Sequence, residues 1–250
     1  MADKVAVVTG ASGGIGNASS LVLAELGFTV VVTGRNTAQL RDLERTILTS
    51  GGSALSRHCD VRDETSVSSL FSDVLNQLGR LDLLFNNAGL LGPFAPTEDV
   101  SFDDWSSVLA TNLTGTFLCT RAAFRMMKNQ NPQGGRIINN GSVSAHVPRV
   151  NAIGYTATKH GITGITRSTA LDGRKYRIAC GQIDIGNARS EISGESGWAF
   201  EQPDGSSLIE PTINVDTVAR AVGYMASLPL EANVQFMTIM ATAMPFIGRG

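Results

Sequence analysis

The segment YTATKH places Tyr155 and Lys159 four residues apart in a stretch with helical spacing. Residues four apart lie on one face of a helix, so both side chains can reach the same ligand. A free phenol has a pKa of about 10, and a neighbouring ammonium favours the phenolate and lowers that pKa. Such a tyrosine can act as a general acid and base. Taken alone the pattern is common, and an aromatic ring packed beside a surface lysine is the alternative.

A second chemical signature is the glycine-rich segment TGASGGIG at 9–16. It follows an apolar run and opens a helical one. In that context Gly10 can form the turn, Gly14 can let a pyrophosphate approach the main chain, and Gly16 can allow close helix packing. The amino terminus of the helix then faces the phosphates. The segment therefore predicts a dinucleotide site, and glycines that serve only a tight turn are the alternative.

The hydrophobic pattern predicts the scaffold that positions these residues. Apolar runs of four to seven residues alternate with amphipathic stretches such as 37–51 and 64–79. Continuous apolar runs indicate strands that are buried on both faces. We therefore predict an α/β fold, a single-domain doubly wound Rossmann fold over residues 1–250 with a parallel sheet flanked by helices. The predicted strands are 5–8, 28–32, 81–85, 136–139, 177–183 and 234–240.

The region 187–211 breaks this alternation, because it is polar and interrupted by glycine and proline. It begins just after the strand predicted at 177–183. Ligands of open α/β sheets bind outside the carboxyl ends of the strands, and long irregular segments there are commonly lids. We predict a substrate-covering flap, with a plain surface insertion as the alternative. Candidate substrate contacts lie on loops near the same edge and are 90–94, His146, Asn151 and Trp198.

The glycine spacing G-x-x-x-G-x-G, together with NNAG at 86–89 and YTATK at 155–159, resembles the short-chain dehydrogenase/reductase family. The resemblance extends from Thr9 to about Gly186. It implies an alcohol/carbonyl oxidoreductase in which hydride moves between the nicotinamide and a carbonyl carbon while Tyr155 exchanges a proton with the oxygen.

The same resemblance implies three further catalytic residues. Lys159 would tune the tyrosine and bind the nicotinamide ribose. Ser142, thirteen residues before Tyr155, would bind the substrate oxygen, with Ser144 as its nearest competitor. Asn112 would help to hold a water in a relay to the lysine, and an interface or kink residue is its alternative. The implied catalytic set is Asn112, Ser142, Tyr155 and Lys159.

The second predicted strand ends in VVVTGRN, and the resemblance implies a preference for NADP(H) there. Gly34 stands where NAD-binding relatives have an acidic residue, and Arg35 follows. A guanidinium can pair with a 2′-phosphate, which a carboxylate would repel. Gly13 stands where many NADP-preferring relatives have a basic residue, so the prediction depends mainly on Arg35, with Asn36 and the Ser12 hydroxyl as possible helpers. A solvated surface arginine is the alternative.

Further cofactor contacts follow from the resemblance. Asp60 and Val61 would hold the adenine. The NNAG segment would run close to the adenosine ribose, with Asn87 as the polar contact to that ribose. Ile185 replaces the proline that usually precedes Gly186, which removes a fixed φ angle and adds an N–H. The predicted cofactor residues are Gly10, Ser12, Gly13, Gly14, Ile15, Gly16, Arg35, Asn36, Asp60, Val61, Asn87, Ala88, Gly89, Tyr155, Lys159, Ile185, Gly186 and Ala188.

Composition limits the partners. The formal charge is -2 and no run of lysine or arginine exceeds two residues, so we expect no nucleic acid. The sequence shows no leader and no run of about eighteen apolar residues, so no membrane segment is expected. Three cysteines, Cys59, Cys119 and Cys180, suggest reduced core thiols and a cytoplasmic location. We expect no metal and a small carbonyl or alcohol substrate.

Two other functions remain open at this stage. An epimerase or dehydratase can use the same cofactor transiently, although its carbohydrate substrates usually accompany a larger carboxyl-terminal domain. A catalytically idle dinucleotide-binding regulatory or scaffold protein would lack the Ser-Tyr-Lys set, which is present here. The resemblance also implies a homotetramer or homodimer, with apolar stretches at 104–127, 155–171 and 237–248 as candidate interfaces.

Overall fold

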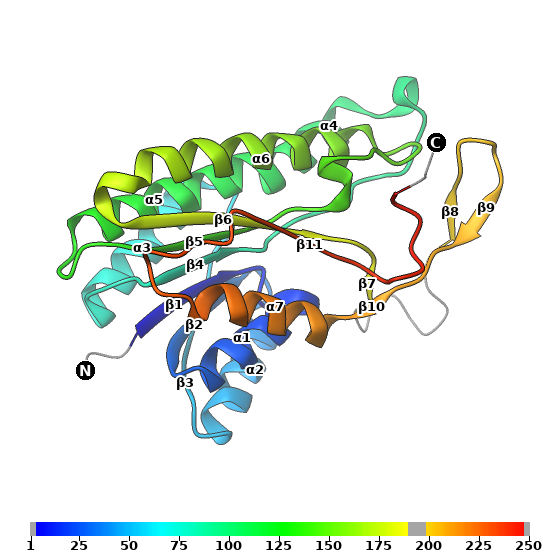
Figure 1. Cartoon of the computed structure of the whole chain (residues 1–250). Helices are drawn as coiled ribbons and strands as arrows, with labels where there is room; N and C mark the ends of the chain where they lie inside the picture. The colour runs from blue at the N-terminus through cyan, green and yellow to red at the C-terminus, as the bar shows by residue number, and fades with distance from the viewer. Residues whose placement is uncertain (1–3, 190–198, 248–250) are drawn as a thin grey trace.

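The computed structural model of the chain describes residues 4–189 and 199–247, which are built around a sheet of seven parallel strands (Figure 1). The strands lie in the order β11-β6-β5-β4-β1-β2-β3. Their bounds are β1 Lys4–Thr9, β2 Phe28–Gly34, β3 Ser53–His58, β4 Leu83–Asn86, β5 Gly135–Asn140, β6 Ile178–Ile185 and β11 Phe236–Ile239.

Helices cover both faces of this sheet (Figure 1). One face carries α1, α2 and α7, and the other carries α3, α5 and α6, with α4 beside α6. Each layer encloses its own hydrophobic core, so the strands between them are apolar on both sides, as the continuous runs predicted. The helices are α1 Gly14–Glu25, α2 Thr37–Thr49, α3 Glu64–Leu78, α4 Phe102–Leu109, α5 Gly115–Asn129, α6 Ile153–Gly173 and α7 Val215–Ser227.

The doubly wound parallel fold predicted from the sequence is confirmed, and all six predicted strands are present. The sequence analysis missed β3, which lies at the edge of the sheet beside β2. Only Ala54 of its six residues is buried, so β3 has no apolar run that could reveal it. β6 also extends further than predicted, through Ile185, which pairs with Ile239 of β11.

The strand order places the ligand cleft. From β1 the chain builds outward through β2 and β3 and then crosses to β4 on the other side of β1, so the direction of winding changes between β1 and β4. The carboxyl ends of these two strands, at Thr9 and Asn86, form a switch point of the kind where open α/β sheets bind ligands. The glycine-rich segment, NNAG and the segment after β5 all begin at this edge.

Short elements cover the same edge. β7 Ala188–Arg189 pairs with β10 Ile213–Asn214, and β8 Ala199–Glu201 forms an antiparallel hairpin with β9 Ser207–Ile209 that projects from the body (Figure 1). β7, β8 and β9 belong to the predicted flap at 187–211, and β10 follows just after it. Residues 190–198 of that flap, including Trp198, lie outside the described residues.

The carboxyl-terminal segment returns over the cleft edge after β11. Ala241 and Met244 pack against Val143 in a small core of their own, with Met240, Phe246 and Ile213 around them. The apolar stretch predicted as an interface at 237–248 is therefore partly covered by its own chain. Among residues 4–189 and 199–247, none of the helices combines the length and the apolar character needed to cross a membrane.

Candidate active site

The loop between β1 and α1 forms a cradle that only glycine can build at two positions. Gly10 has a φ of 63°, and a Cβ there would meet the Ala88 Cα at 2.8 Å. A Cβ on Gly16 would collide with the Gly10 carbonyl oxygen. Gly13, by contrast, has an extended φ of -172° and open space around it. The cradle therefore has room for a ligand above the amino terminus of α1.

Thr9 and Asn87 hold this cradle in place. The Thr9 hydroxyl accepts hydrogen bonds from the main-chain N–H groups of Asn87 and Ala88, at 2.9 and 3.0 Å. The Asn87 amide donates to the carbonyl oxygens of Thr9 and Gly10 and accepts from the side chain of Asn140 at 2.9 Å. Both ends of the amide are thus used within the protein. A ribose contact from the Asn87 side chain stays a prediction, whereas its support of the loop is observed.

Two arginines, Arg35 and Arg62, line the outer end of the cleft. Arg35 is exposed and makes no hydrogen bond or ion pair with the residues the structure describes. Asn36 beside it caps α2, because its side chain accepts a hydrogen bond from the Gln39 N–H. The Arg62 guanidinium holds both carboxylate oxygens of Asp60, and the pKa of that carboxyl is lowered to about 2 mainly by this hydrogen bonding. Arg62 had not been predicted at this end.

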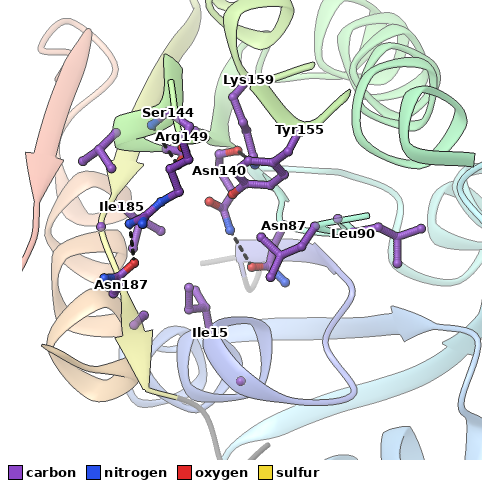
Figure 2. A pocket seen from close by; sticks show the side chains of 18 of the residues that line it. Ile15, Asn87, Leu90, Asn140, Ser144, Arg149, Tyr155, Lys159, Ile185 and Asn187 are labelled. Atoms are coloured by element: carbon purple, nitrogen blue, oxygen red, sulfur yellow. Dashed lines mark hydrogen bonds between the residues drawn. The ribbon is translucent and has the colours of Figure 1, made fainter. Parts of the chain in front are cut away.

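Ser142, Tyr155 and Lys159 line one cavity of about 360 Å³ at the inner end of the cleft (Figure 2). Tyr155 and Lys159 lie one turn apart in α6, as their spacing predicted. The Lys159 Nζ donates to the Asn140 carbonyl oxygen at 2.7 Å and lies 5.4 Å from the centre of the Tyr155 ring. Ser142 follows β5 and starts the short helix η3 Val143–Ala145, where its hydroxyl accepts from the Ser144 N–H.

Burial dominates the charge balance of this cavity. It raises the pKa of Tyr155, and the hydrogen bond with Ser142 and the charge of Arg149 oppose that rise. It lowers the pKa of Lys159 to about 8, against the opposing charge of Asp184. We had expected the lysine to lower the tyrosine pKa. In the protein without ligand, the loss of hydration outweighs the neighbouring charges.

Asn112 lies behind the cavity and does not line it. It is buried in η2 Ala110–Thr114, a turn of π-helix between α4 and α5. Its side-chain oxygen accepts from the Leu90 N–H at 2.7 Å, and its amide donates to the Leu90 carbonyl oxygen at 2.8 Å and to the Thr158 hydroxyl. The observed role of Asn112 is to fix the main chain at Leu90. The water relay stays a prediction.

The loop after β6 is held by the end of the sheet. Ile185 is buried, and the N–H of Gly186 donates to the Ile239 carbonyl oxygen at 2.9 Å. A Cβ on Gly186 would meet the Met240 Cβ at 2.6 Å, so the main chain passes close to the carboxyl-terminal segment. Ile185 is the last residue of β6 and pairs with Ile239 of β11.

The structure gathers most of the predicted site residues along one continuous cleft. Gly14, Asn87, Gly89 and Leu90 line both the inner cavity and an adjoining cavity of about 400 Å³ at the outer end. Two predicted residues, Gly16 and Asn112, lie behind the walls. The remainder line the two cavities and are Gly10, Ser12, Gly13, Ile15, Arg35, Asn36, Asp60, Val61, Ala88, Ser142, Tyr155, Lys159, Ile185, Gly186 and Ala188.

Further polar residues in and around the inner cavity were missed. Asn140 connects the cradle to the lysine, because its side chain contacts Asn87 and its carbonyl oxygen accepts from Lys159 (Figure 2). Asp184 is fully buried in β6 and accepts from the Ser142 N–H at 3.1 Å. Arg149 lines the cavity. The sequence held a signal for Asp184, since a carboxylate within an otherwise buried strand needs partners.

Arg149 connects several segments around the inner cavity. Its guanidinium donates to Asn187 at 2.8 Å (Figure 2). It also donates to Glu210 at 2.7 Å and lies 4.0 Å from the centre of the Phe200 ring. Phe200 in turn packs against Phe94, with ring centres 5.8 Å apart.

Other predicted substrate contacts have mixed outcomes. Leu90, Leu91 and Phe94 line the inner cavity. His146 bonds to Asp184, and Asn151 bonds to Glu201 of β8. Among the described residues, no group of three histidine, cysteine, aspartate or glutamate side chains could hold a metal ion, and all three cysteines are free and buried.

Comparisons with known proteins agree with this architecture. A cis-4-hydroxycyclohexanecarboxylate dehydrogenase of Sinomonas cyclohexanicum is 34% identical over 90% of each chain. A 3beta-hydroxysteroid dehydrogenase of Mediterraneibacter gnavus is 35% identical over 72% of this chain, but the match spans only 64% of that protein. The crystal structure of a metagenomic short-chain oxidoreductase in complex with NADP is 30% identical and covers 94% of this chain and 96% of its own, with a TM-score of 0.79.

A family model described as short chain dehydrogenase matches residues 4–198, which is most of the chain. The match includes the glycine cradle, the segment after β5 and the Tyr155–Lys159 pair. The chain therefore belongs to the short-chain dehydrogenase/reductase family.

Proposed function

We propose that the protein is an NADP(H)-dependent oxidoreductase that interconverts a carbonyl and a secondary alcohol, with Tyr155 as the general acid and base. One observation carries this proposal. The cavity that contains Ser142, Tyr155 and Lys159 shares Gly14, Asn87 and Gly89 with the cavity above the glycine cradle. A dinucleotide held by its phosphates at the cradle can therefore extend to the catalytic side chains.

The residues present fit such a cofactor. The cradle leaves no space for side chains at Gly10 and Gly16, and the amino terminus of α1 favours an anion. Arg35 provides an exposed guanidinium without a hydrogen bond or ion pair in the described part of the chain, which suits a 2′-phosphate. NADP is also named in the structure of the metagenomic relative. When bound, the nicotinamide supplies or accepts the hydride.

The chain's own residues then divide the remaining work. Ser142 orients the substrate oxygen and stabilises the charge that develops on it. During reduction the Tyr155 hydroxyl donates its proton to that oxygen, and during oxidation it takes the proton back. Lys159 keeps a positive charge beside the tyrosine and binds the nicotinamide ribose. The raised pKa of Tyr155 means that its proton is available for donation at neutral pH.

The substrate end of the cavity favours an apolar and uncharged body. Leu90, Leu91, Phe94 and Phe200 provide aliphatic and aromatic surface among the described residues. The charge of Arg149 is already paired with the buried carboxylate of Glu210. An added carboxylate would have to compete with Glu210 for that guanidinium and lose its hydration. We propose a ketone or secondary alcohol with an apolar, ring-sized body.

Tyr155→Phe tests the reaction. This variant keeps the ring and removes the hydroxyl, so we expect turnover to fall about a hundredfold or more while the Kd for NADPH stays close to that of the wild type. An unchanged rate would contradict the acid role. Absence of NADPH oxidation by the wild type with every carbonyl tried, despite NADPH binding, would favour the idle binding protein. Product that accumulates without net change in NADPH would favour an epimerase or dehydratase.

A matched pair of ketones tests the substrate class. Cyclohexanone and 4-oxocyclohexanecarboxylate share a ring and differ by one carboxylate. We expect kcat/KM to be at least about tenfold higher for cyclohexanone, because a buried charge without a free partner costs more than about 1.4 kcal/mol. A preference for the carboxylate would show that Arg149 is available to the substrate.

Assembly and location complete the proposal. Large apolar side chains are exposed on three helices, at Phe102 in α4, Phe117 in α5 and Leu171 in α6, which supports a homodimer or homotetramer. Free buried cysteines suit the reducing cytoplasm. Light scattering after size-exclusion chromatography tests the assembly, and a monomer at micromolar concentration would contradict it.

A further inference from the structure

Among the residues that the structure describes, Asp184 is the carboxylate that bonds to the main chain of Ser142. Its side chain is fully buried near the carboxyl end of β6. Three groups bond to it: the Ser142 N–H at 3.1 Å, the Gln182 side-chain amide at 2.7 Å and the His146 Nε2 at 2.8 Å. A buried carboxylate is tolerated when hydrogen bonds replace its hydration, and this one is well supplied.

The segment after β5 lies directly against this carboxylate. A Cβ on Gly141 would collide with the Asp184 Oδ1, so only glycine lets the chain pass this close. The residue before Gly141 is Asn140, whose carbonyl oxygen accepts from Lys159 at 2.7 Å. The residue after it is Ser142. The Asp184 carboxylate therefore supports the segment Asn140–Ser142. At one end of this segment it bonds to the Ser142 main chain, and at the other end Asn140 accepts the hydrogen bond from Lys159.

Asp184 also balances charge. Lys159 is only 5% exposed and makes no ion pair within 4 Å among the described residues. The other buried acid, Glu210, is paired with Arg149. Three titratable or charged groups act on Tyr155 and Lys159 or on their partners. They are Asp184 of β6, Arg149 of the loop between η3 and α6, and His146, which is bonded to Asp184. Of these, Asp184 favours the charged lysine.

We propose that Asp184 is a positioning residue of this site: it holds the main chain of Ser142 from below and supplies the buried negative charge that keeps Lys159 protonated. The proposal rests on the proposed function in taking Ser142 and Lys159 as members of the catalytic set. Asp184, two residues before Gly186, thus takes part in the chemistry although its side chain does not line the cavity. His146, predicted as a candidate substrate contact, is a partner of that carboxylate.

Asp184→Asn separates the charge from the shape. The amide oxygen can still accept from the Ser142 and Gln182 donors, and the amide nitrogen can donate to His146, whose tautomer is free to change. We therefore expect the variant to fold and to bind NADPH. Only the negative charge is removed. Asp184→Ser removes the same charge and leaves a hydroxyl acceptor, and it serves as a second variant should the asparagine protein not fold.

The titration of Lys159 is the decisive readout and needs neither substrate nor turnover. The chain has four lysines, Lys4, Lys128, Lys159 and Lys175, so carbon-13 labelling of the lysine ε position gives few signals, and Lys159→Arg identifies the one of interest. We expect the Lys159 midpoint to be lower in Asp184→Asn than in the wild type, corresponding to about a tenfold weaker proton affinity.

His146→Gln is the matched control. A glutamine amide can also donate to Asp184 and leaves its carboxylate in place, so this variant should not lower the Lys159 midpoint. Coincident Lys159 titrations in the wild type and Asp184→Asn would overturn the charge role. The Lys159 midpoint could be lowered in Asp184→Asn while kcat for reduction at pH 8 stays equal to that of the wild type. That result would show that the lysine charge does not matter for the reaction.

The two proposals fail in different ways. If Tyr155→Phe keeps full turnover, the proposed function is wrong, yet the Lys159 titration still decides whether Asp184 controls that charge. If the titrations coincide while Tyr155→Phe is inactive, the proposed function stands and the Asp184 proposal is wrong.

Discussion

The inner and outer ends of the cleft differ in how much of their geometry the protein fixes by itself. At the inner end, Ser142, Lys159 and Asp184 are at most 5% exposed, and each is hydrogen-bonded to a distant part of the chain. At the outer end, Arg35 is exposed and has no hydrogen bond or ion pair within residues 4–189 and 199–247. The inner end is thus organised by folding, whereas Arg35 at the outer end is not held in place by the described residues.

This difference has a consequence for substitutions. A change at the inner end alters groups whose positions depend on one another, so it affects the reaction rate and can affect folding. If the proposed cofactor contact of Arg35 is correct, a change at the outer end should affect affinity and leave the fold intact. The predictions below test the contrast from the inner end outward.

Lys159→Met should have the largest effect. Methionine has a similar length and no charge, so the buried side chain is replaced without a large cavity while the cation beside Tyr155 is lost. We expect kcat to fall about a hundredfold or more with little loss of thermal stability. The matched control is Lys175→Met, which removes an exposed lysine whose Nζ lies 5.0 Å from the centre of the Tyr176 ring. Equal turnover in the two variants would show that the inner lysine has no catalytic role.

Gly16→Ala and Gly13→Ala test the region between the two ends. A Cβ at Gly16 collides with the Gly10 carbonyl oxygen, so the loop or α1 must shift. We expect a loss of about 1–3 kcal/mol in the free energy of unfolding and weaker NADPH binding. A Cβ at Gly13 meets nothing within 4 Å, and its φ of -172° suits any residue.

Urea unfolding checks this pair. The Gly13→Ala protein should unfold within about 0.5 kcal/mol of the wild type. If both variants lose the same stability, the cradle is not limited by the close approach of Gly16 to Gly10, and the space above Gly13 is not as open as the structure describes.

Arg35→Ser tests the outer end. Since the arginine has no hydrogen bond or ion pair in the described residues, its loss should leave the melting temperature unchanged. We expect the Kd for NADPH to rise about tenfold, the loss of one charge-assisted contact, while the Kd for NADH stays the same. Fluorescence titration of each cofactor measures this, with Arg41→Ser on the exposed side of α2 as control. An equal loss for NADH would assign Arg35 to a part common to both cofactors.

The sequence was informative where local spacing decides the geometry. Tyr155 and Lys159 share a helix face because they are four residues apart, and the glycine cradle follows from the turn between one strand and one helix. The apolar runs predicted the sheet for the same reason, since burial on both faces leaves a local pattern. β3 was not predicted because an edge strand with one buried residue leaves no such apolar pattern in the sequence.

Contacts between distant segments were not accessible from spacing. Asp184 meets Ser142 only because β6 lies beside β5, with 42 residues between them in sequence. Asn87 turned out to support the cradle because β4 lies beside β1, although its segment had suggested a ribose contact. In both cases the residue types were visible, but their partners were set by the strand order.

The pH dependence of NADPH use gives the smallest effect and reports on both ends at once. The pKa of Lys159 is lowered to about 8 in the protein without ligand, so the lysine is charged below that pH and loses its proton above it. The pKa of Tyr155 is raised, so the tyrosine keeps its proton through the same range. We therefore expect kcat/KM for NADPH in reduction to be level near pH 7 and to be about twofold lower near pH 8, where half of the lysine has lost its proton.

Two variants separate the contributions to this profile. Lys159→Arg keeps its charge throughout, so its profile should stay level above pH 8 even if its rate is lower. Arg35→Ser should lower the whole profile without moving the pH at which the fall begins, because the part of the cofactor proposed to contact Arg35 differs from the part proposed to contact Lys159. A shift of that pH in Arg35→Ser would mean that the two ends of the cleft are coupled, and the contrast between a preformed inner end and a ligand-dependent outer end would have to be abandoned.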